Sequence, residues 1–392
     1  MFNLEKTTNI KVDIVKIVNN IFSDAIKQGA SDIHLESTRD GMVVRYRIDG
    51  LLKVISSGNK ELREFIFSRI KIMANVETTG LPRPQEGNIK FEYKKDKFVD
   101  LRVSIFPTNL GECCVIRILE STKYFDNYKD LGFTDEQVKI LEKTIHKPYG
   151  LVLVTGPNGS GKSTTLFTIL NKLNTPERSL VTLEDPVERQ IDMVRQTNIN
   201  PEIGLTFASG LRYLLRQDPD IIMVGEIRDK ETAKIAVQAA MTGHLVLATI
   251  HTNNAAGAIV RLNNMGVEPF LISSALRFVS AQRLARLNCP YCREEYEPPR
   301  ELLEKLDAPK SIKFYHSVGC DKCNFKGVKG RVGVHEVLVV TKRIQEMILK
   351  KPSDEHINKI AIEEGMMTLH QAALAKTYEG LISIEEAIRL TE

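Results

Sequence analysis

The segment 151–173 constrains the fold of this chain more than any other part of the sequence. It begins with the apolar run LVLVT, continues with GPNGSGKS and ends in the helix-like stretch TTLFTILNKL. This is the pattern GxxxxGK[ST] in the order strand, loop and helix that a phosphate-binding P-loop requires. Its glycines let successive backbone N–H groups converge on phosphate oxygens at a helix N-terminus, where the helix dipole also favours negative charge. The sequence therefore predicts an α/β nucleotide-binding core.

The P-loop predicts ATP and Mg²⁺ as ligands. The Lys162 ammonium is expected to neutralise the β and γ phosphates, and the Ser163 hydroxyl is expected to bind Mg²⁺. A degenerate loop without nucleotide is the alternative, which the agreement between motif and context disfavours. The predicted nucleotide-binding residues are Gly156, Pro157, Asn158, Gly159, Ser160, Gly161, Lys162, Ser163 and Thr164.

Two later apolar runs end in acidic residues that a P-loop needs as partners. LVTLEDPVER places Glu184 at the end of one strand, and IIMVGEIRD places Glu226 just after another. Many P-loop enzymes carry an aspartate before the second glutamate, whereas Gly225 stands there in this chain, which weakens direct Mg²⁺ binding. A glutamate at a strand end can instead orient the attacking water or reach the metal through water. The alternative is that these carboxylates are helix caps or solvated strand ends.

His244 and His251 bracket another apolar strand, in GHLVLATIHTNN. An imidazole can donate a hydrogen bond to a γ-phosphate or accept one, so both histidines are candidate phosphate sensors at the two ends of one strand. For each of them, the alternative is a hydrogen-bonded core histidine without a catalytic role.

Apolar strands alternate with helical stretches from residue 151 onward. Continuous apolar strands are typical of a parallel sheet covered on both faces. A helix with the capping-box residues Thr134 and Gln137 precedes them. We expect the ATPase core to span 134–288, followed by a cysteine-rich module at 289–331 and a C-terminal helical region at 332–392.

Upstream of this core, the sequence predicts a small α+β domain over 12–119. Apolar residues recur at helical spacing from 12 to 28, and the later stretches MVVRYRID and KFVDLRVSIF alternate between apolar and polar positions as half-buried strands do. The polar stretch at 120–133 is expected to be a linker and hinge, and 1–11 a flexible terminus.

Length and charge limit the classes of protein that remain. A chain of 392 residues exceeds the ~250–300 residues at which a single core stops growing, so two or three domains are expected. There are 54 Lys and Arg against 50 Asp and Glu, a balance too even for a nucleic-acid coat protein. The first residues lack the apolar core of a signal peptide, and no run of ~18 apolar residues occurs, so a cytoplasmic protein is expected.

Four of the six cysteines form two CxxC pairs, Cys289 with Cys292 and Cys320 with Cys323. Two thiolate pairs suit tetrahedral Zn²⁺, and four protein ligands leave no open position for water, so the zinc is expected to be structural. Four free structural cysteines are the alternative. The adjacent Cys113 and Cys114 face opposite ways on a predicted strand and are expected to be ordinary thiols.

Taken in order, these segments resemble the secretion ATPase superfamily, which powers type II secretion, type IV pilus extension and retraction, and competence fibres. TLEDPVE, DPDIIMVGEIRD and TGHLVLATIHTNNA are similar to its Asp, Walker B and His boxes. GASDIHLE, VRYRIDG and VDLRVSIFPTNLGECCVIRIL resemble its second N-terminal domain. AQRLARLNCPYC and GRVGVHEVL resemble the C-terminal region of extension-type members, and the resemblance covers residues 12–392.

The resemblance implies a RecA-like core behind a PAS-like α+β domain, and it implies roles for single residues. Glu184 is expected to position or activate the attacking water, and Glu226 to act on the Mg²⁺ side. Arg102 and Arg117 match arginines that swing onto phosphate from the N-terminal domain, which a planar guanidinium can do; solubility is the alternative reason for arginines on strands. The expected catalytic residues are Lys162, Glu184, Glu226, Arg102, Arg117, His244 and His251, the two histidines as γ-phosphate sensors or couplers between boxes.

The implied assembly is a homohexamer that hydrolyses ATP and acts on an inner-membrane platform protein from the cytoplasmic side. Within the family, the cysteine module marks extension-type motors, which favours type IV pilus assembly. A type II secretion pseudopilus or competence DNA uptake is the alternative, and pilus retraction is less favoured.

Two hypotheses that assign the chain to other classes of protein are disfavoured. A nucleic-acid translocase needs a basic stripe with stacking aromatic residues, whereas acidic residues accompany the basic ones around the cysteines and the chain lacks tryptophan. No nucleic-acid partner is therefore expected. A non-hydrolysing scaffold is countered by the presence of both strand-end acids.

The chain departs from the family pattern in two places. Where many members carry LPQDGR it has LPRPQEGN, so Asn88 stands in place of an arginine. Long members carry a further N-terminal domain that docks on the platform, whereas about eleven residues precede the first predicted helix here. Recruitment is therefore expected to use another surface.

Overall fold

The computed structural model describes residues 13–48, 51–81, 83–94, 97–119, 125–188, 190–306 and 312–391. The chain divides into two units, Met1–Lys123 and Tyr124–Glu392. The predicted terminus 1–11 and the first residues of the predicted linker, 120–124, lie outside the described part. Residues 125–133 of that linker belong to the second unit and include the short 3₁₀ helix η1, Tyr128–Leu131.

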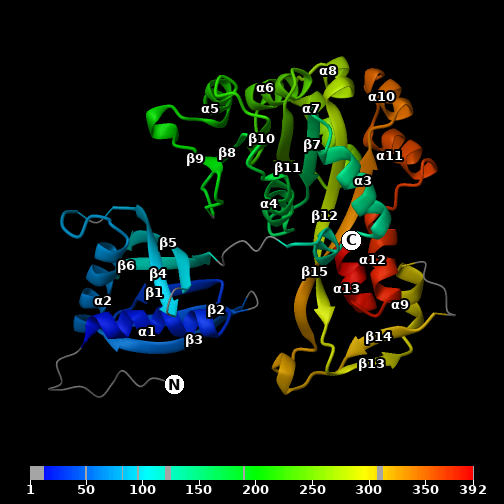
Figure 1. Ribbon diagram of the computed structural model, residues 1–392. Coiled ribbons are helices and arrows are strands. Elements are labelled where there is room, and N and C mark those ends of the chain that lie inside the picture. The colour runs from blue at the N-terminus through cyan, green and yellow to red at the C-terminus, as the bar shows by residue number, and fades with distance from the viewer. Residues whose placement is uncertain are drawn as a thin grey trace. The chain divides into compact units, whose positions relative to one another are not determined.

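The first unit is a six-stranded antiparallel sheet with two helices on one face (Figure 1). Strand side chains alternate between the two faces, and the apolar set packs against α1 (Ile14–Lys27) and α2 (Lys60–Met73). This confirms the predicted α+β arrangement. The strand order is β3-β2-β1-β6-β5-β4, with β1 (Asp32–Ser37), β2 (Gly41–Ile48), β3 (Leu51–Asn59), β4 (Gln85–Lys94), β5 (Lys97–Thr108) and β6 (Gly111–Leu119).

The second unit is built on a seven-stranded sheet in the order β15-β12-β7-β11-β10-β8-β9. All neighbouring strands run parallel except β12 and β15, which are antiparallel. The predicted α/β class with a parallel sheet is therefore confirmed. The strands are β7 (Gly150–Thr155), β8 (Leu180–Glu184), β9 (Val194–Asn198), β10 (Ile221–Val224), β11 (Leu245–Ile250), β12 (Leu276–Asn288) and β15 (Val328–Val339).

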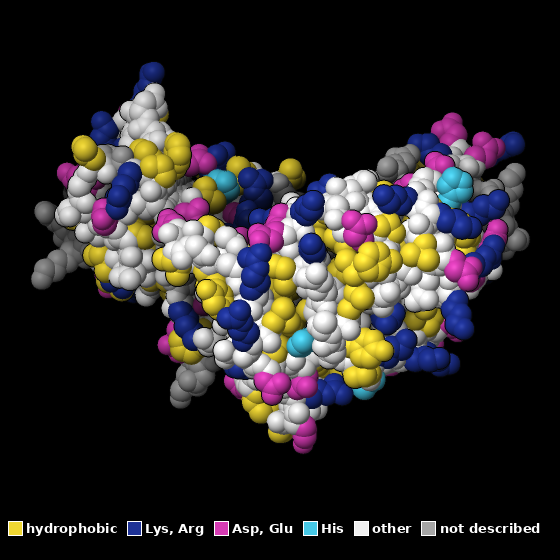
Figure 2. All heavy atoms as spheres, turned by 90° about the horizontal axis from the view of Figure 1, so that it is seen from above, with side chains coloured by type: hydrophobic (Ala, Val, Ile, Leu, Met, Phe, Trp, Pro, Cys, Tyr) yellow, Lys and Arg dark blue, Asp and Glu magenta, His cyan; other side chains and the backbone are white. Residues whose placement is uncertain are grey.

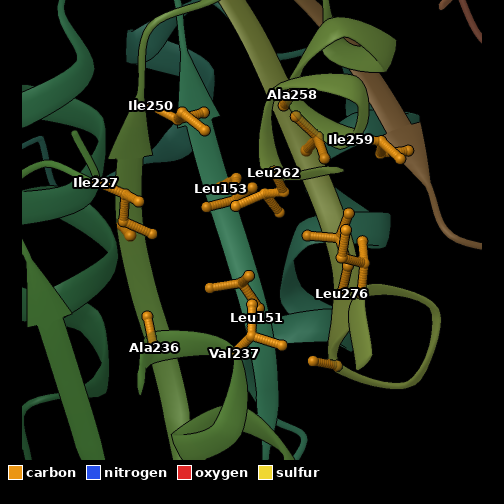
Figure 3. Close-up of a cluster of buried hydrophobic side chains, with 14 of the residues drawn as sticks. Leu151, Leu153, Ile227, Ala236, Val237, Ile250, Ala258, Ile259, Leu262 and Leu276 are labelled. Atoms are coloured by element: carbon orange, nitrogen blue, oxygen red, sulfur yellow. The ribbon is translucent and has the colours of Figure 1, made fainter. Parts of the chain in front are cut away.

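Strand β7 explains why this sheet is covered on both faces. Leu151 and Leu153 project into one core, shown in Figure 3, whereas Val152 and Val154 project into a second core on the opposite face. A strand that is apolar at every inner position must be buried on both sides. The first core is formed with α5 (Phe207–Leu214), α6 (Lys230–Met241), α7 (Ala255–Asn264) and α8 (Pro269–Ala275), and the second with α3 (Asp135–Ile145) and α4 (Lys162–Leu173).

The C-terminal part differs from the predicted helical region 332–392. Residues 332–339 belong to β15, because the valine-rich stretch VGVHEVLV favours a strand and finds a long antiparallel partner in β12. The helices begin later, as α10 (Lys342–Leu349), α11 (Asp354–Glu363), α12 (Leu369–Tyr378) and α13 (Ile384–Thr391).

Between β12 and β15 the chain forms a small module that carries the paired cysteines. Two short antiparallel strands form its sheet. Its elements are β13 (Arg293–Tyr296), α9 (Arg300–Lys305), β14 (Phe314–Ser317) and the 3₁₀ helix η3 (Asp321–Cys323). In the described residues of the whole chain, we find no helix with both the length and the apolar character needed to cross a bilayer.

Candidate active site

The P-loop, residues 156–161, leaves the sheet between β7 and α4. Gly156, Gly159 and Gly161 have φ angles of 146°, 75° and 89°, a backbone region that favours glycine. A Cβ on Gly156 would lie 2.4 Å from the carbonyl oxygen of Gln282, so a larger residue does not fit. No side-chain hydrogen bond caps the start of α4 in the described structure, so its first N–H groups can bind an anion. The loop therefore fits the phosphates of ATP.

Lys162 is the first residue of α4, and its Nζ donates to the carbonyl oxygens of Gly156 and Pro157 at 3.0 and 3.1 Å. Burial lowers the pKa of this ammonium, and the nearby Glu226 carboxylate opposes that shift. The lysine thus lies against the P-loop, where it is predicted to neutralise the bound phosphates. Of the other predicted loop residues, Asn158 and Ser163 are exposed, Ser160 is buried, and Thr164 lies half-buried in the first turn of α4.

Gln282, on the neighbouring strand β12, holds the P-loop and was not predicted. Its Nε2 donates to the Ser160 carbonyl at 2.7 Å, and its Oε1 accepts from the Thr165 hydroxyl at 3.0 Å. The side chain is 1% exposed, so both halves of the amide are satisfied inside the protein. It joins the loop to α4 and fixes their relative geometry. No local pattern indicated this role, because it depends on the pairing of β12 with β7.

Glu184 is the last residue of β8 and is only 3% exposed. Its Oε1 accepts hydrogen bonds from Thr182 Oγ1 at 2.5 Å and from Gln196 Nε2 at 2.9 Å. Burial raises the pKa of this carboxyl above its usual value, and the two hydrogen bonds oppose the shift. A carboxylate anchored in this way keeps one orientation, as the positioning of an attacking water requires.

Glu226 lies just past β10, in a cluster with His251 and Arg228. Its Oε1 is 3.0 Å from His251 Nε2, and its Oε2 accepts from Arg228 Nε at 2.7 Å. Because β10, β11 and β7 are parallel neighbours in register, this cluster lies at the sheet edge where the P-loop begins. The structure thus brings Lys162, Glu226 and His251 together. Arg228 was missed, although its place two residues after Glu226 was a signal.

The two predicted histidines lie at opposite ends of β11. His251 follows the strand, at the P-loop edge, whereas His244 precedes it. The Nδ1 of His244 lies 3.1 Å from the carbonyl oxygen of Ala239 near the end of α6. A six-residue strand spans roughly 20 Å, so the structure does not bring His244 to the P-loop of its own chain. The role predicted for His244, as a γ-phosphate sensor or a coupler between boxes, therefore stays a prediction.

The segment after His251 is tied to the P-loop strand by contacts that the sequence did not reveal. The Thr155 and Thr252 hydroxyls are 2.8 Å apart, and the Thr252 N–H donates to Thr155 Oγ1 at 2.8 Å. Arg283 Nη2 donates to the Asn253 carbonyl at 3.0 Å. Residues 252–254, which we call the nucleotide-site loop, are therefore fixed at the same sheet edge.

Arg102 and Arg117 lie side by side in the first unit, as register partners on β5 and β6. Arg102 Nη2 donates to Glu86 Oε2 at 2.8 Å, and Arg117 Nε donates to Asp32 Oδ1 at 2.9 Å. Burial raises the pKa of Asp32, but hydrogen bonds from Ser31 and Arg117 outweigh it, so the pKa is lowered overall. Both arginines are thus held by carboxylates within their own unit, and their action on phosphate stays a prediction.

The four paired cysteines gather in the small module. The Sγ separation is 3.9 Å between Cys289 and Cys320, 3.8 Å between Cys292 and Cys323, and 3.8 Å between Cys320 and Cys323. All four sulfurs lie within 4.8 Å of one another. Zn–S bonds of about 2.3 Å in a tetrahedron set S–S separations of roughly 3.8 Å, so these thiols fit Zn²⁺. Cys114, by contrast, is buried on β6 beside half-buried Cys113.

The chain is similar to known proteins along almost its whole length. Residues 8–389 match the family model described as Type II/IV secretion system protein. The chain is 44% identical over 381 residues to Type II secretion system ATPase E of Vibrio cholerae, covering 97% of this chain and 75% of that protein. It is 45% identical over 381 residues to Type IV pilus assembly ATPase PilB of Thermus thermophilus, covering 96% of this chain and 43% of that protein.

Solved structures are similar as well. The crystal structure of the pilus retraction motor PilT with bound ADP has a TM-score of 0.68 and 26% identity, with 97% of each chain covered. The ATPase DotB of Legionella pneumophila has a TM-score of 0.71 at 19% identity, which shows a likeness of fold.

Proposed function

Because the chain belongs to the type II/IV secretion system protein family, whose members are ATPases, we propose that this ATPase is the hexameric motor that powers extension of type IV pili. In this proposal it acts on an inner-membrane platform protein from the inner face of the cell membrane.

The observation that supports ATP hydrolysis is the meeting of the P-loop, Glu226 and Glu184 at the carboxyl ends of parallel strands. Lys162 and the P-loop N–H groups would hold the phosphates, and Ser163 with Glu226 would hold Mg²⁺, which supplies neutralisation of phosphate charge. Glu184 accepts a hydrogen bond from the attacking water and orients it. His251 contacts Glu226 and, through this contact, responds to the presence of the phosphate.

The motion that we propose is a closure of the small domain about the predicted linker 120–133. Arg102 or Arg117 then leaves its carboxylate partner and binds phosphate, because a guanidinium offers planar paired donors to phosphate oxygens. Hydrolysis removes the bound γ-phosphate and reverses the closure, which delivers the stroke.

The observation that favours extension over retraction is the four-cysteine cluster, which fits Zn²⁺ and resembles the module of extension-type motors. The 45% identity to the pilus assembly ATPase PilB of Thermus thermophilus points the same way. The retraction motor PilT is similar in fold at the lower identity of 26%.

A second candidate is the type II secretion ATPase. It is favoured by the 44% identity to the Vibrio cholerae protein, of which this chain covers 75%. Both candidates use the same nucleotide chemistry and differ in the fibre that is assembled.

A nucleic-acid translocase has no comparable support. Basic and acidic side chains are interspersed across the face that Figure 2 displays. In the cysteine module, Lys313 pairs with Glu295 at 2.9 Å, and His316 lies 3.2 Å from Glu294. Charges paired in this way do not form the continuous basic groove that a single strand requires.

The test is deletion of the gene in its host, with surface pili, secreted proteins and DNA uptake measured in the same strain. Loss of pili with unchanged secretion is the result that we expect. Loss of secretion with unchanged pili would transfer the assignment to type II secretion, and an excess of pili would identify a retraction motor.

A further inference from the structure

Glu336, toward the C-terminal end of β15, is a buried carboxylate with no role in the site described above; it is 4% exposed. Its Oε1 accepts from the backbone N–H of Ala255 at 2.7 Å, and its Oε2 accepts from the backbone N–H of Leu369 at 3.1 Å. Ala255 is the first residue of α7 and Leu369 the first residue of α12. One side chain therefore joins the starts of two helices that are far apart in the sequence.

These two contacts determine where the carboxylate can lie. Burial raises the pKa of Glu336, whereas the two N–H donors and the charge of Arg283 lower it. A buried carboxylate that loses its partners is strongly destabilised, and helix N-termini supply partial positive charge that offsets the burial. We therefore expect a shift of the start of either helix to move the carboxylate. The carboxylate would in turn move the start of the other helix.

On one side, this link begins at the nucleotide site. Thr252 of the nucleotide-site loop is bonded to Thr155 at the end of β7, and Arg283 holds the Asn253 carbonyl. Asn254 caps α7, with its Oδ1 accepting from Gly257 N at 2.7 Å. His251, which contacts Glu226, directly precedes the loop. These contacts connect Glu226 to the start of α7.

On the other side, the link reaches the C-terminal helices. Helix α12 packs with α13 and the cysteine module in one apolar cluster, which includes Ala373, Ile384 and Phe314. Lys376 of α12 also donates to the Gly132 carbonyl at 2.9 Å, in the segment that leads into α3. Helix α12 therefore touches both the cysteine module and the end of the predicted linker.

We propose that Glu336 is a positioning residue that couples the nucleotide-site loop 252–254 to helix α12. The proposal rests on nucleotide binding at the P-loop. Through the contacts of Glu336 with Ala255 and Leu369, the state of the phosphate site sets the position of α12. Helix α12 transmits this change of position to the cysteine module and to residue 132. Adjacent His335 faces the opposite side of β15, where its Nε2 lies 3.0 Å from the Leu131 carbonyl, so the same strand also contacts the linker segment directly.

The experiment is hydrogen exchange of the full chain with and without Mg²⁺ and a non-hydrolysable ATP analogue. In the wild type, we expect nucleotide to slow exchange of 156–163 and to change exchange of both 255–258 and 369–372. In Glu336→Gln, the side-chain NH₂ group faces one of the two N–H donors, so one link is lost. We expect the response at 255–258 to remain and the response at 369–372 to disappear.

A second variant keeps the test independent of the stability of Glu336→Gln. Proline is favoured at the first position of a helix, and Thr368 has the extended ψ of 161° that a residue before proline needs. Leu369→Pro therefore deletes the N–H that bonds Glu336, and Leu369→Ala controls for the lost side chain. We expect only the proline variant to lose the nucleotide response of α12.

Glu386→Gln is the matched control for a buried carboxylate. Glu386 accepts from the Arg286 backbone N–H at 2.7 Å but has no contact with the nucleotide-site loop among the described interactions. We expect Glu386→Gln to leave the response of 369–372 intact. Protection of the P-loop with no response at α12 in the wild type, or an unchanged response in Glu336→Gln and Leu369→Pro, would overturn the coupling alone. Absence of P-loop protection in the wild type would overturn the nucleotide site and the coupling together.

Discussion

At the nucleotide site, the ionised state that a side chain needs for catalysis can conflict with its burial. Glu184 must be ionised to orient water, yet it is buried at the end of β8, which favours its neutral form. Thr182 and Gln196 compensate in part by donating to one oxygen. The same residue is therefore expected to contribute to catalysis while it lowers the stability of the fold.

We predict that Glu184→Gln strongly lowers the rate of ATP hydrolysis and does not destabilise the protein. The native state holds the Glu184 proton more tightly than the unfolded chain, so ionisation lowers the free energy of unfolding as pH rises from the ordinary value of 4.5 through the raised native pKa. The glutamine keeps an acceptor oxygen for both donors and carries no charge. Hydrolysis should fall by about 10²-fold or more.

The check is ATP turnover together with thermal unfolding at several pH values. The stability of Glu184→Gln relative to the wild type should increase as pH rises above 4.5. A variant that still hydrolyses ATP at the wild-type rate would remove Glu184 from the mechanism.

We also predict that Gln282 determines nucleotide affinity through the shape of the P-loop. Gln282→Met keeps the side-chain length but leaves the Ser160 carbonyl and the Thr165 hydroxyl without their partner, which costs about 1–3 kcal/mol. The KM for ATP should rise while the secondary structure is kept. Gln345→Met is the matched control, because Gln345 Nε2 donates to the Ser273 carbonyl at 3.1 Å away from the P-loop. Equal effects of both changes on KM would contradict this role.

At the scale of elements, local signals were predictable from the sequence and long-range pairings were not. The capping box of Thr134 and Gln137 and the strand before the P-loop were predicted because each depends on neighbouring residues alone. Strand β12 mixes polar and apolar residues, and β15 follows the cysteine module, so their pairing was hidden. The positions of Gln282 and Glu336 depend on that pairing and could not be inferred.

In the candidate active site, too, local signals were predictable from the sequence and long-range contacts were not. Motif spacing predicted Lys162 and Glu226, and the parallel sheet brings them to one edge. The pattern of β11 suggested equal roles for His244 and His251, although a strand end facing the P-loop is available to only one of them. The contact of Arg228 with Glu226 is local, whereas the contact of Thr252 with Thr155 belongs to the tertiary structure.

The cysteine module is predicted to require zinc for its own folding but not for the folding of the parallel sheet. Removal of zinc by a chelator, or Cys320→Ser, leaves thiols without a shared ligand, and metal binding supplies much of the folding free energy of such small modules. We expect one zinc per chain by elemental analysis and faster proteolysis of 289–327 on its loss. Cys113→Ser should leave the zinc content unchanged, and a zinc-free chain with an intact module would contradict the prediction.

At the scale of the whole molecule, the first unit carries the arginines and the second carries the P-loop. We propose that the arginines act on phosphate during turnover of an assembled ring. Arg102→Ala should then lower kcat with little change in stability, because an exposed ion pair contributes about 0–1 kcal/mol. Arg300→Ala removes a similarly exposed pair in the cysteine module and is the control. An unchanged kcat in Arg102→Ala, measured on the hexameric fraction, would remove Arg102 from the proposed mechanism.

We propose that ATP hydrolysis by this chain powers the assembly of a surface fibre. The decisive measurement is the number of surface pili in a strain that lacks the gene. This strain is complemented with the wild type or with Glu184→Gln at equal protein levels. We expect the wild type to restore pili and Glu184→Gln to leave the strain without them. Pili restored equally by Glu184→Gln, or present in normal number without the gene, would contradict the claim.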